Sequence, residues 1–193
     1  ILYVGRFTPV KGIERLISAA AHLRQYQGLR LMIVGGDGHL SSSSRALKRL
    51  TRSLRIDRNV IFQGRVDHDA LSSYYSSADV LVVPSYYESF GLVALEALAC
   101  GTPVVAARVG AMDSLILDGK TGAIVDDPTP RSLADVIEKF ISPQHNERLS
   151  QEEIRASVLD KNWINAASSI IEEYRSAIDS TTREQEKKQL LHC

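Results

Sequence analysis

The sequence predicts an α/β protein with a doubly wound, mostly parallel, six-stranded Rossmann-like sheet, followed by C-terminal helices. Six short runs of β-branched and other apolar residues are spread over the first 125 residues. Segments with apolar residues at helical spacing separate these runs. Alternation of strand and helix requires crossover connections, which give parallel strands and helices on both faces of the sheet. In such sheets, ligands bind at the carboxyl ends of the strands.

Each apolar run is short and rich in valine, isoleucine or leucine, as expected for strands that are buried on both faces. The runs cover residues 1–4, 29–34, 60–62, 80–83, 104–107 and 123–125. The chain begins with Ile1 rather than methionine, and it shows no signal-peptide pattern. We therefore expect a fragment of a longer protein.

Helical periodicity is clear in the first intervening segment, where one apolar stripe is formed by Ile13, Leu16, Ile17, Ala20 and Leu23. Further helices are expected over 46–54, 71–77, 92–100 and 133–141, and the serine run 41–44 is interpreted as a flexible loop carrying an N-cap. Two more helices are expected over 147–159 and 163–178. These assignments give a Rossmann-like domain over 1–145, C-terminal helices over 146–179 that pack on it or on a missing domain, and a polar tail over 180–193.

The composition argues against several functional classes. The 193 residues include 23 Lys and Arg and 23 Asp and Glu, so the formal net charge is zero and a broadly basic nucleic-acid-binding surface is not expected. No apolar run reaches the roughly 18 residues of a membrane span. Two cysteines, Cys100 and Cys193, cannot form a disulfide framework, and none of the five histidines is at metal-ligand spacing. We therefore expect a cytoplasmic protein without a metal.

The stretch 84–103, which follows the fourth expected strand, contains the most informative pattern. Ser89 is interpreted as the N-cap of a helix, and Gly101 as the glycine just beyond its C-terminus. The backbone N–H groups of Phe90, Gly91 and Leu92 would then be free, at the positive end of the helix dipole. We expect this helix start to bind a phosphate group.

Two acidic residues belong to the same stretch. An ionised Glu96 requires a partner, such as the two hydroxyls of a sugar diol, because its sequence neighbours are apolar. Glu88 precedes the helix and is expected on a loop at the mouth of the ligand crevice. In the alternative interpretation, Glu88 is a solvated loop acid and Glu96 belongs to the exposed stripe of an amphipathic helix.

A second group of chemically active residues follows the first expected strand, in the loop 5–12. This loop carries two cations, Arg6 and Lys11, five positions apart. Converging on the same crevice, they would neutralise the roughly two negative charges of a diphosphate, arginine as a planar fork and lysine as a point charge. The alternative is that both side chains are solvated surface residues.

Together these segments resemble the group-1 (family 4) retaining glycosyltransferases. The matching motifs occur in the family's order over residues 1–141, namely Val4-Gly5-Arg6, Lys11-Gly12, Ala78-Asp79-Val80, Pro84-Ser85, Glu88-Ser89-Phe90-Gly91-Leu92, Leu95-Glu96-Ala97 and Cys100-Gly101-Thr102-Pro103-Val104-Val105. That family has the GT-B fold of two Rossmann-like domains, and the part resembled is the C-terminal, nucleotide-sugar-binding domain. The resemblance implies that the N-terminal acceptor domain is missing here.

The resemblance also implies a role for each site residue. Arg6 and Lys11 would hold the donor diphosphate and stabilise the charge that develops on it, Glu88 would contact hydroxyls of the donor sugar, and Glu96 would bind the ribose hydroxyls. Backbone amides of residues 90–92 would lie against the sugar and phosphates. Arg6, Lys11 and Glu88 are thus the expected catalytic residues, and no metal or other cofactor would be required.

The implied activity is transfer of a hexosyl unit from a UDP- or GDP-sugar to a hydroxyl of a sugar, a polyol or a lipid-linked sugar. Because the acceptor contacts belong to the missing domain, we expect the chain to be inactive alone, and to be cytoplasmic or peripheral at the inner membrane face. The alternative is a non-catalytic nucleotide-sugar-binding module, or a subunit that needs a partner chain.

Two details of the resemblance concern the donor. The run 85–101 most resembles enzymes that make sucrose phosphate or glycosylate inositol phosphate, which favours a UDP-sugar. Residues 109–114 read Val-Gly-Ala-Met-Asp-Ser, where family members often have Val-Gly-Gly-x-Pro-Glu. This departure lies beside the expected donor-sugar site, so the resemblance does not identify the sugar.

Overall fold

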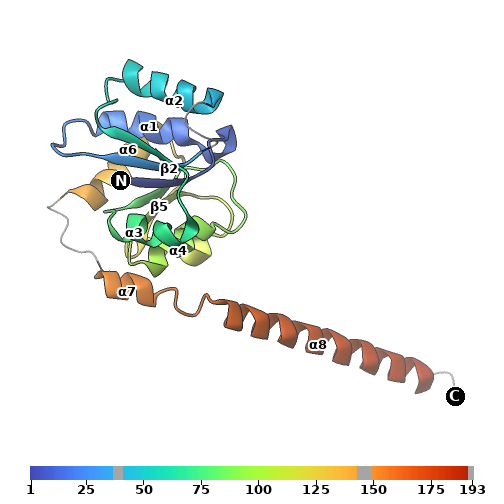
Figure 1. Ribbon diagram of the computed structural model, residues 1–193. Coiled ribbons are helices and arrows are strands. Elements are labelled where there is room, and N and C mark those ends of the chain that lie inside the picture. Colours follow the sequence, from blue (N-terminus) through green and yellow to red (C-terminus); the bar gives the residue numbers. More distant parts are fainter. Residues whose placement is uncertain (37–40, 143–148, 191–193) are drawn as a thin grey trace. The chain divides into compact units, whose positions relative to one another are not determined.

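The computed structural model describes residues 1–36, 41–142 and 149–190 (Figure 1). The chain divides into two compact units, Ile1–Val158 and Leu159–Cys193. The first unit contains one six-stranded sheet in the order β3-β2-β1-β4-β5-β6, and all five neighbouring pairs are parallel. The doubly wound sheet predicted from the sequence is confirmed.

Each strand lies within two residues of its predicted position. Successive side chains of a strand point to opposite faces, and both faces are apolar because helices cover both. Tyr3 and Val82 belong to one of the two core clusters, whereas Leu2 and Leu81 belong to the other. The strands are β1 (Leu2–Gly5), β2 (Leu31–Gly35), β3 (Val60–Gly64), β4 (Leu81–Val83), β5 (Val104–Ala107) and β6 (Gly122–Val125).

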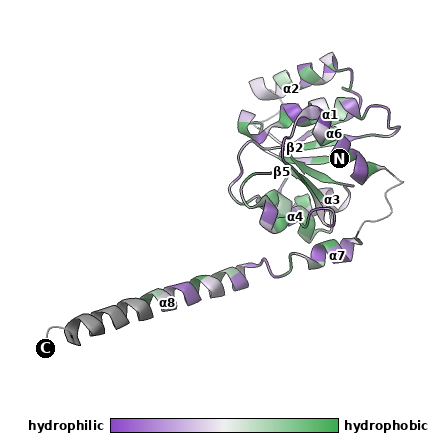
Figure 2. Cartoon of the chain, turned by 180° about the vertical axis from the view of Figure 1, so that it is seen from behind, coloured by the Kyte–Doolittle hydropathy of each residue, from purple (hydrophilic) through white to green (hydrophobic). Residues whose placement is uncertain are grey.

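Helices cover both faces of the sheet (Figure 1), and the strands between them are coloured mostly as hydrophobic (Figure 2). The first layer consists of α1 (Ile13–His22), α2 (Ser42–Ser53) and α6 (Pro130–Ile141). The second consists of α3 (Leu71–Ser76), α4 (Leu92–Ala99) and α5 (Met112–Leu115).

Two of these helices begin earlier than predicted, in both cases because a hydroxyl side chain caps them. Ser41 accepts a hydrogen bond from the Ser44 N–H at 3.1 Å, so most of the predicted serine loop is the first turn of α2. Thr129 caps α6 in the same way, and Pro130 occupies its first position, where the fixed φ of proline suits a helix. Three short elements were not predicted: α5 and the 3₁₀ turns η1 (Pro9–Lys11) and η2 (His68–Ala70).

The C-terminal helices differ in length from the prediction. α7 (Gln151–Ala156) begins with a capping box formed by Ser150 and Glu153, and its Ile154 is buried in the same core cluster as α4. α7 therefore belongs to the first unit. α8 (Trp163–Leu190) forms the second unit and extends through most of the predicted tail. The predicted helix start at 147 lies outside the described residues, and no helix within them is long and apolar enough to span a membrane.

Candidate functional site

The candidate site lies where the order of the sheet reverses. β1 and β4 are central neighbours, and the chain proceeds from β1 towards one edge and from β4 towards the other. This arrangement leaves a crevice at the carboxyl ends of the two central strands. A cavity of about 290 Å³ occurs there, and its walls include Arg6, Lys11, Glu88, Phe90, Gly91 and Leu92. The structure thus brings together six of the seven residues that the sequence singled out.

The loops that follow β1 and β4 contact each other directly. The Tyr86 N–H donates a hydrogen bond of 2.8 Å to the Val10 carbonyl. Gly12, at φ 63°, packs so closely against the end of β4 that a Cβ there would lie 2.0 Å from the Pro84 carbonyl oxygen. This close approach holds Lys11 opposite Glu88.

Lys11 and Glu88 form an ion pair across the cavity. The Lys11 Nζ donates to Glu88 Oε2 at 2.7 Å, and the Ser85 hydroxyl donates to the same oxygen at 3.3 Å. The two charged side chains are 22% and 13% exposed, so the pair is only partly screened by solvent. Arg6 is exposed and forms no ion pair within the described part of the chain. The sequence analysis assigned Lys11 and Glu88 to different parts of a ligand and did not anticipate that they pair.

The start of α4 differs from the prediction in one respect. Ser89 is not the N-cap, because the helix begins two residues later and Gly91 occupies the cap position with left-handed φ and ψ of 85° and 48°. The N–H groups of the first helical turn are therefore those of Leu92, Val93 and Ala94. Of these three, the Ala94 N–H bonds to the Gly91 carbonyl, which also accepts from the Leu95 N–H. The Leu92 and Val93 N–H groups are therefore the open amides of the first helical turn, and both residues line the cavity together with Phe90 and Gly91.

The predicted end of α4 is confirmed. Gly101 follows the helix at φ 79°, its N–H bonds to the Leu98 carbonyl, and the Thr102 N–H bonds to the Ala97 carbonyl. These two bonds form a Schellman motif, which satisfies carbonyls that the helix end would otherwise leave open.

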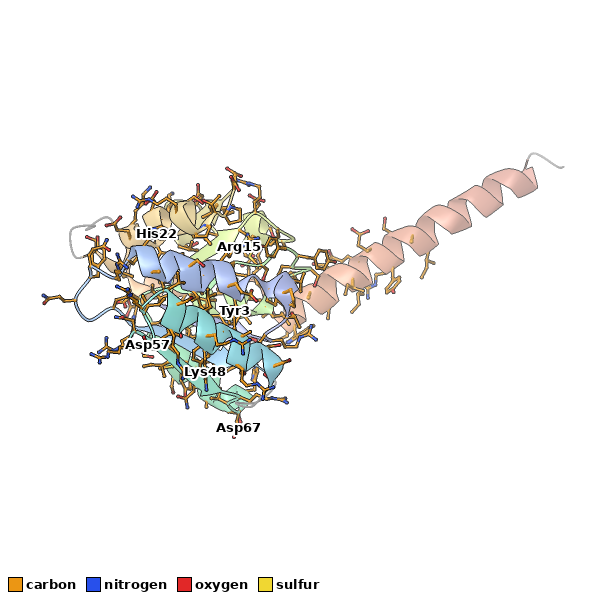
Figure 3. The ribbon with its side chains drawn as sticks, turned by 90° about the horizontal axis from the view of Figure 1, so that it is seen from above. Tyr3, Arg15, His22, Lys48, Asp57 and Asp67 are labelled. Atoms are coloured by element: carbon orange, nitrogen blue, oxygen red, sulfur yellow. The ribbon has the colours of Figure 1, made fainter. Side chains whose placement is uncertain are left out.

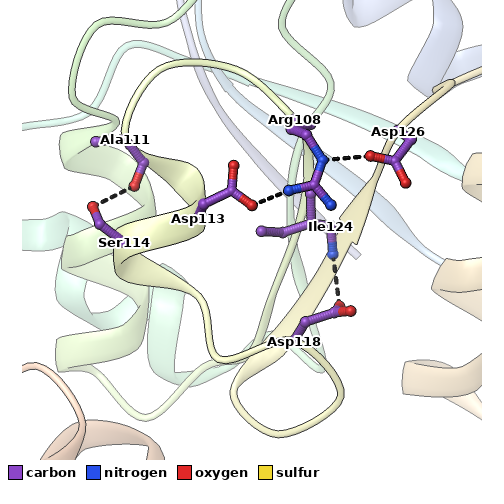
Figure 4. A network of polar contacts seen from close by, with 7 residues as sticks. All are labelled: Arg108, Ala111, Asp113, Ser114, Asp118, Ile124 and Asp126. Carbon is purple, nitrogen blue, oxygen red and sulfur yellow. Dashed lines mark hydrogen bonds and ion pairs between the residues drawn. The ribbon is translucent and has the colours of Figure 1, made fainter.

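The segment 109–114, which departs from the family pattern, packs against the start of α4. Arg108 forms ion pairs with Asp113 in α5 and with Asp126 after β6 (Figure 4). These bonds fix α5, whose Met112 is fully buried and lies against Gly91. A Cβ at position 91 would lie 2.3 Å from the Met112 Cε, so glycine is required there for packing as well as for its positive φ.

Glu96 lies outside the cavity, slightly more than one helical turn beyond Leu92. Its Oε2 accepts a hydrogen bond of 2.6 Å from the Tyr75 hydroxyl, and its Oε1 lies 3.5 Å from the His68 Nε2. Burial and the bond to Glu96 raise the pKa of Tyr75 above its usual value. The sequence predicted that Glu96 needs a partner because its neighbours are apolar, but it did not show which residue this partner is. In the structure, the partner is Tyr75.

Tyr3 is a site residue that the sequence analysis missed. It lies on β1 (Figure 3), lines the cavity, and donates a hydrogen bond of 2.9 Å from its hydroxyl to the Arg6 carbonyl. Burial, together with the charges of Glu14 and Glu88, raises the pKa of Tyr3. A tyrosine within an otherwise aliphatic strand was the available signal, because a buried hydroxyl needs a partner.

Metal ligands do not gather at this site. Within the described residues, no group of three or more His, Cys, Asp or Glu side chains is arranged to hold a metal ion. The charged groups around the cavity are Arg6, Lys11 and Glu88. This set can bind an anion that also carries hydroxyl groups.

Comparison with known proteins identifies the family. Residues 1–156 match the family described as glycosyl transferases group 1. The chain is 39% identical over 184 residues to the D-inositol 3-phosphate glycosyltransferase of Acidothermus cellulolyticus, covering 92% of this chain and 41% of that protein. The chain thus spans about two fifths of the length of this curated relative.

Solved structures agree with this assignment. Sucrose-phosphate synthase from Thermosynechococcus elongatus superposes with a TM-score of 0.80 at 38% identity, over 93% of this chain and 45% of that one. Anabaena Alr3699/HepE, solved in complex with UDP-glucose, has a TM-score of 0.75 at 22% identity, over 91% and 48% of the two chains, and shares the fold. The Rossmann-like sheet matches GT-B glycosyltransferase structures, and the chain belongs to the group 1 glycosyl transferases.

Proposed function

We propose that this chain is the donor-binding part of a retaining glycosyltransferase that transfers a hexosyl unit from a UDP- or GDP-sugar to an acceptor hydroxyl. One observation carries the proposal: Arg6, Lys11, Glu88 and the start of α4 line a single cavity at the switch point of the sheet. Cations and free amides recognise phosphates, whereas a carboxylate recognises hydroxyls. A sugar diphosphate presents both kinds of group side by side.

The donor diphosphate would bind between the β1 loop and the start of α4. Arg6 and Lys11 supply two positive charges, and the Leu92 and Val93 amides supply further donors. Charge grows on the diphosphate as the glycosidic bond breaks, and groups already fixed in place stabilise that charge without reorganising. We therefore propose that donor binding needs no metal ion.

The donor sugar would bind beside the diphosphate, against Glu88. Among the described residues, Lys11 and Ser85 donate to this carboxylate, and both reach Oε2. Oε1 is left to accept hydrogen bonds from sugar hydroxyls. The ion pair would thus couple the two binding functions, because Lys11, which binds the phosphate, also orients Glu88, which binds the sugar.

The nucleoside would extend along α4 towards Glu96, which would accept hydrogen bonds from the ribose. A uridine nucleotide is supported by the relatives, since HepE was solved with UDP-glucose. The acceptor would be a sugar, a polyol or a lipid-linked sugar, and it would contact the part of the relatives' length that this chain does not span. We accordingly propose that the chain binds donor but transfers sugar poorly by itself. The second candidate is a non-catalytic nucleotide-sugar-binding module that needs a partner chain.

Peripheral attachment of the cytoplasmic enzyme to the inner membrane face is supported by the charge of the β3 edge of the sheet. Residues 24–65 contain nine Lys and Arg and two Asp, in a chain whose net charge is zero. Arg45, Arg49 and Arg52 of α2 are exposed and form no ion pair with the described residues. Each cation near an anionic bilayer contributes about 1 kcal/mol. Co-sedimentation with vesicles should require anionic lipid and weaken in high salt; equal binding to neutral vesicles would contradict attachment by charge.

Calorimetric titration of the chain with UDP, GDP and ADP, with and without EDTA, tests the site. Arg6→Ala and Lys11→Met should each weaken binding at least about 10-fold, as expected for loss of a charge-assisted bond. The matched control is Arg131→Ala, which removes an exposed arginine of α6. Unchanged affinity in both site variants, or loss of binding in EDTA, would contradict the proposal. Turnover assays on the isolated chain and on a chain extended by an acceptor domain separate the enzyme from the module.

A further inference from the structure

We infer that Tyr75 is a positioning residue for the donor: its buried hydroxyl holds the Glu96 carboxylate in the orientation that receives the ribose hydroxyls. The inference deepens the proposed function and rests on the role proposed there for Glu96. It adds a residue on α3, outside the cavity and outside every motif of the sequence analysis. The argument depends on how the two side chains are held, on the protonation of the phenol, and on the carboxylate oxygen that remains open.

The Tyr75–Glu96 bond is held rigidly from both sides. Tyr75 is 1% exposed and packs in the core cluster that contains α4. Its backbone carbonyl accepts a hydrogen bond of 2.6 Å from the buried Thr102 hydroxyl, so the end of α3 is tied to the turn that closes α4. The bond of 2.6 Å between the Tyr75 hydroxyl and Glu96 Oε2 thus joins two elements that the Thr102 side chain also links. A carboxylate anchored in this way keeps one rotamer.

The phenol acts only as a donor to this carboxylate. Burial, and then the hydrogen bond to Glu96, raise the pKa of Tyr75, so the hydroxyl stays protonated at neutral pH. A carboxylate oxygen offers about two acceptor positions, and Tyr75 uses one position on Oε2. The bond therefore orients Glu96 without consuming its capacity to accept hydrogen bonds.

The other oxygen, Oε1, is accessible to a ligand. Its described neighbour is His68 Nε2 at 3.5 Å, and the His68 side chain is 79% exposed and can move away at little cost. Glu96 itself is 32% exposed. Residues three and four apart share one side of a helix, so Glu96 lies on the same side of α4 as Leu92 and Val93, which line the cavity. A nucleoside that follows α4 away from the diphosphate would reach this oxygen.

Tyr75 is expected to strengthen binding because it orders the Glu96 side chain before the nucleotide binds. A glutamate without this anchor would lose side-chain freedom when the ribose binds, and ordering one such side chain corresponds to about a 2- to 10-fold change in Kd. Tyr75→Phe keeps the ring and removes the hydroxyl alone. We therefore expect Tyr75→Phe to raise the Kd for UDP by this factor.

The test is calorimetric titration of the 193-residue chain with UDP and with 2′,3′-dideoxy-UDP. The variants are Tyr75→Phe, Glu96→Gln and the matched control Tyr74→Phe, which removes a hydroxyl one residue earlier on the same helix. Tyr75→Phe and Glu96→Gln should weaken UDP binding, whereas Tyr74→Phe should not. With the dideoxy nucleotide, all three variants should bind as the parent chain does, because the hydroxyls that Glu96 would receive are absent.

The outcomes separate the inference from the proposed function. If Glu96→Gln leaves UDP affinity unchanged, or the parent chain binds no nucleotide, the proposed function fails. If Glu96→Gln weakens UDP binding but Tyr75→Phe does not, the positioning role of Tyr75 is wrong. If Tyr75→Phe lowers the affinity for UDP and for 2′,3′-dideoxy-UDP equally, the role of Tyr75 is merely structural. Glu96→Asp, which is too short to reach Tyr75, is an independent check: its loss should not grow when Tyr75→Phe is added.

Discussion

Replacing Gly12 by alanine should separate the two loops that form the cavity. Gly12 has φ 63°, and an added Cβ would lie 2.0 Å from the Pro84 carbonyl oxygen, whereas real Cβ contacts essentially never fall below 3.0 Å. One of the two backbones must therefore move by at least 1 Å. That movement would stretch the backbone hydrogen bond between the Tyr86 N–H and the Val10 carbonyl, which links the two loops.

The size of the effect follows from three contributions. Left-handed φ costs a non-glycine residue about 1–2 kcal/mol, overpacking a close contact costs about 1–3 kcal/mol, and a weakened hydrogen bond costs up to about 1 kcal/mol. We expect Gly12→Ala to lower the free energy of unfolding by about 2–6 kcal/mol. Gly28 is the matched control, because it has φ 83° but an added Cβ would meet nothing within 4 Å. Gly28→Ala should cost only about 1–2 kcal/mol.

Urea unfolding followed by circular dichroism measures both variants under the same conditions. The excess loss in Gly12→Ala over Gly28→Ala reports the steric contact together with the hydrogen bond that it weakens. UDP titration should show weaker binding for Gly12→Ala and unchanged binding for Gly28→Ala, because only the first moves Lys11. If the two variants differed by less than about 1 kcal/mol, the close packing of the β1 loop on β4 would be refuted.

Three further predictions follow from the contacts. Lys11→Met leaves Glu88 partly buried and unpaired, so it should cost about 1–3 kcal/mol of stability, and adding Glu88→Gln should recover part of this loss in urea unfolding. Thr102→Val removes one of two donors to the Tyr75 carbonyl, which also accepts from the Ala78 N–H, so it should cost about 0.5–1.5 kcal/mol in the same assay; a neutral result would mean that the Thr102 bond does not stabilise the fold. The folded state raises the pKa of Tyr75, so the stability that depends on its protonated hydroxyl is complete below about pH 10, the usual pKa of tyrosine, and is lost as the pH rises further. Above about pH 10, the free energy of unfolding should therefore decrease less steeply with pH for Tyr75→Phe than for the parent chain. Equal slopes for the two proteins would contradict this.

The fold was largely predictable because its signals are local. Apolar runs and helical stripes depend on residues close in sequence, and alternation along the chain then dictates a parallel sheet. Errors occurred where a cap decided the boundary: hydroxyl caps started α2 and α6 early, and Gly91 rather than Ser89 begins α4. Serine is the commoner cap, but the left-handed backbone and the packing against Met112 at this position require glycine.

The candidate site was also predictable only in part. Which residue types surround the crevice was readable from the sequence, because Arg6 and Lys11 follow one central strand, Glu88 follows the other, and parallel strands end at one edge. Which atoms pair was not readable. The Lys11–Glu88 bond spans 77 residues and the Tyr75–Glu96 bond spans 21, so each depends on how separate elements pack. The sequence alone thus determined the chemistry available at the edge of the sheet, whereas only tertiary packing decided the partner of each charge, because that choice depends on distances between atoms remote along the chain.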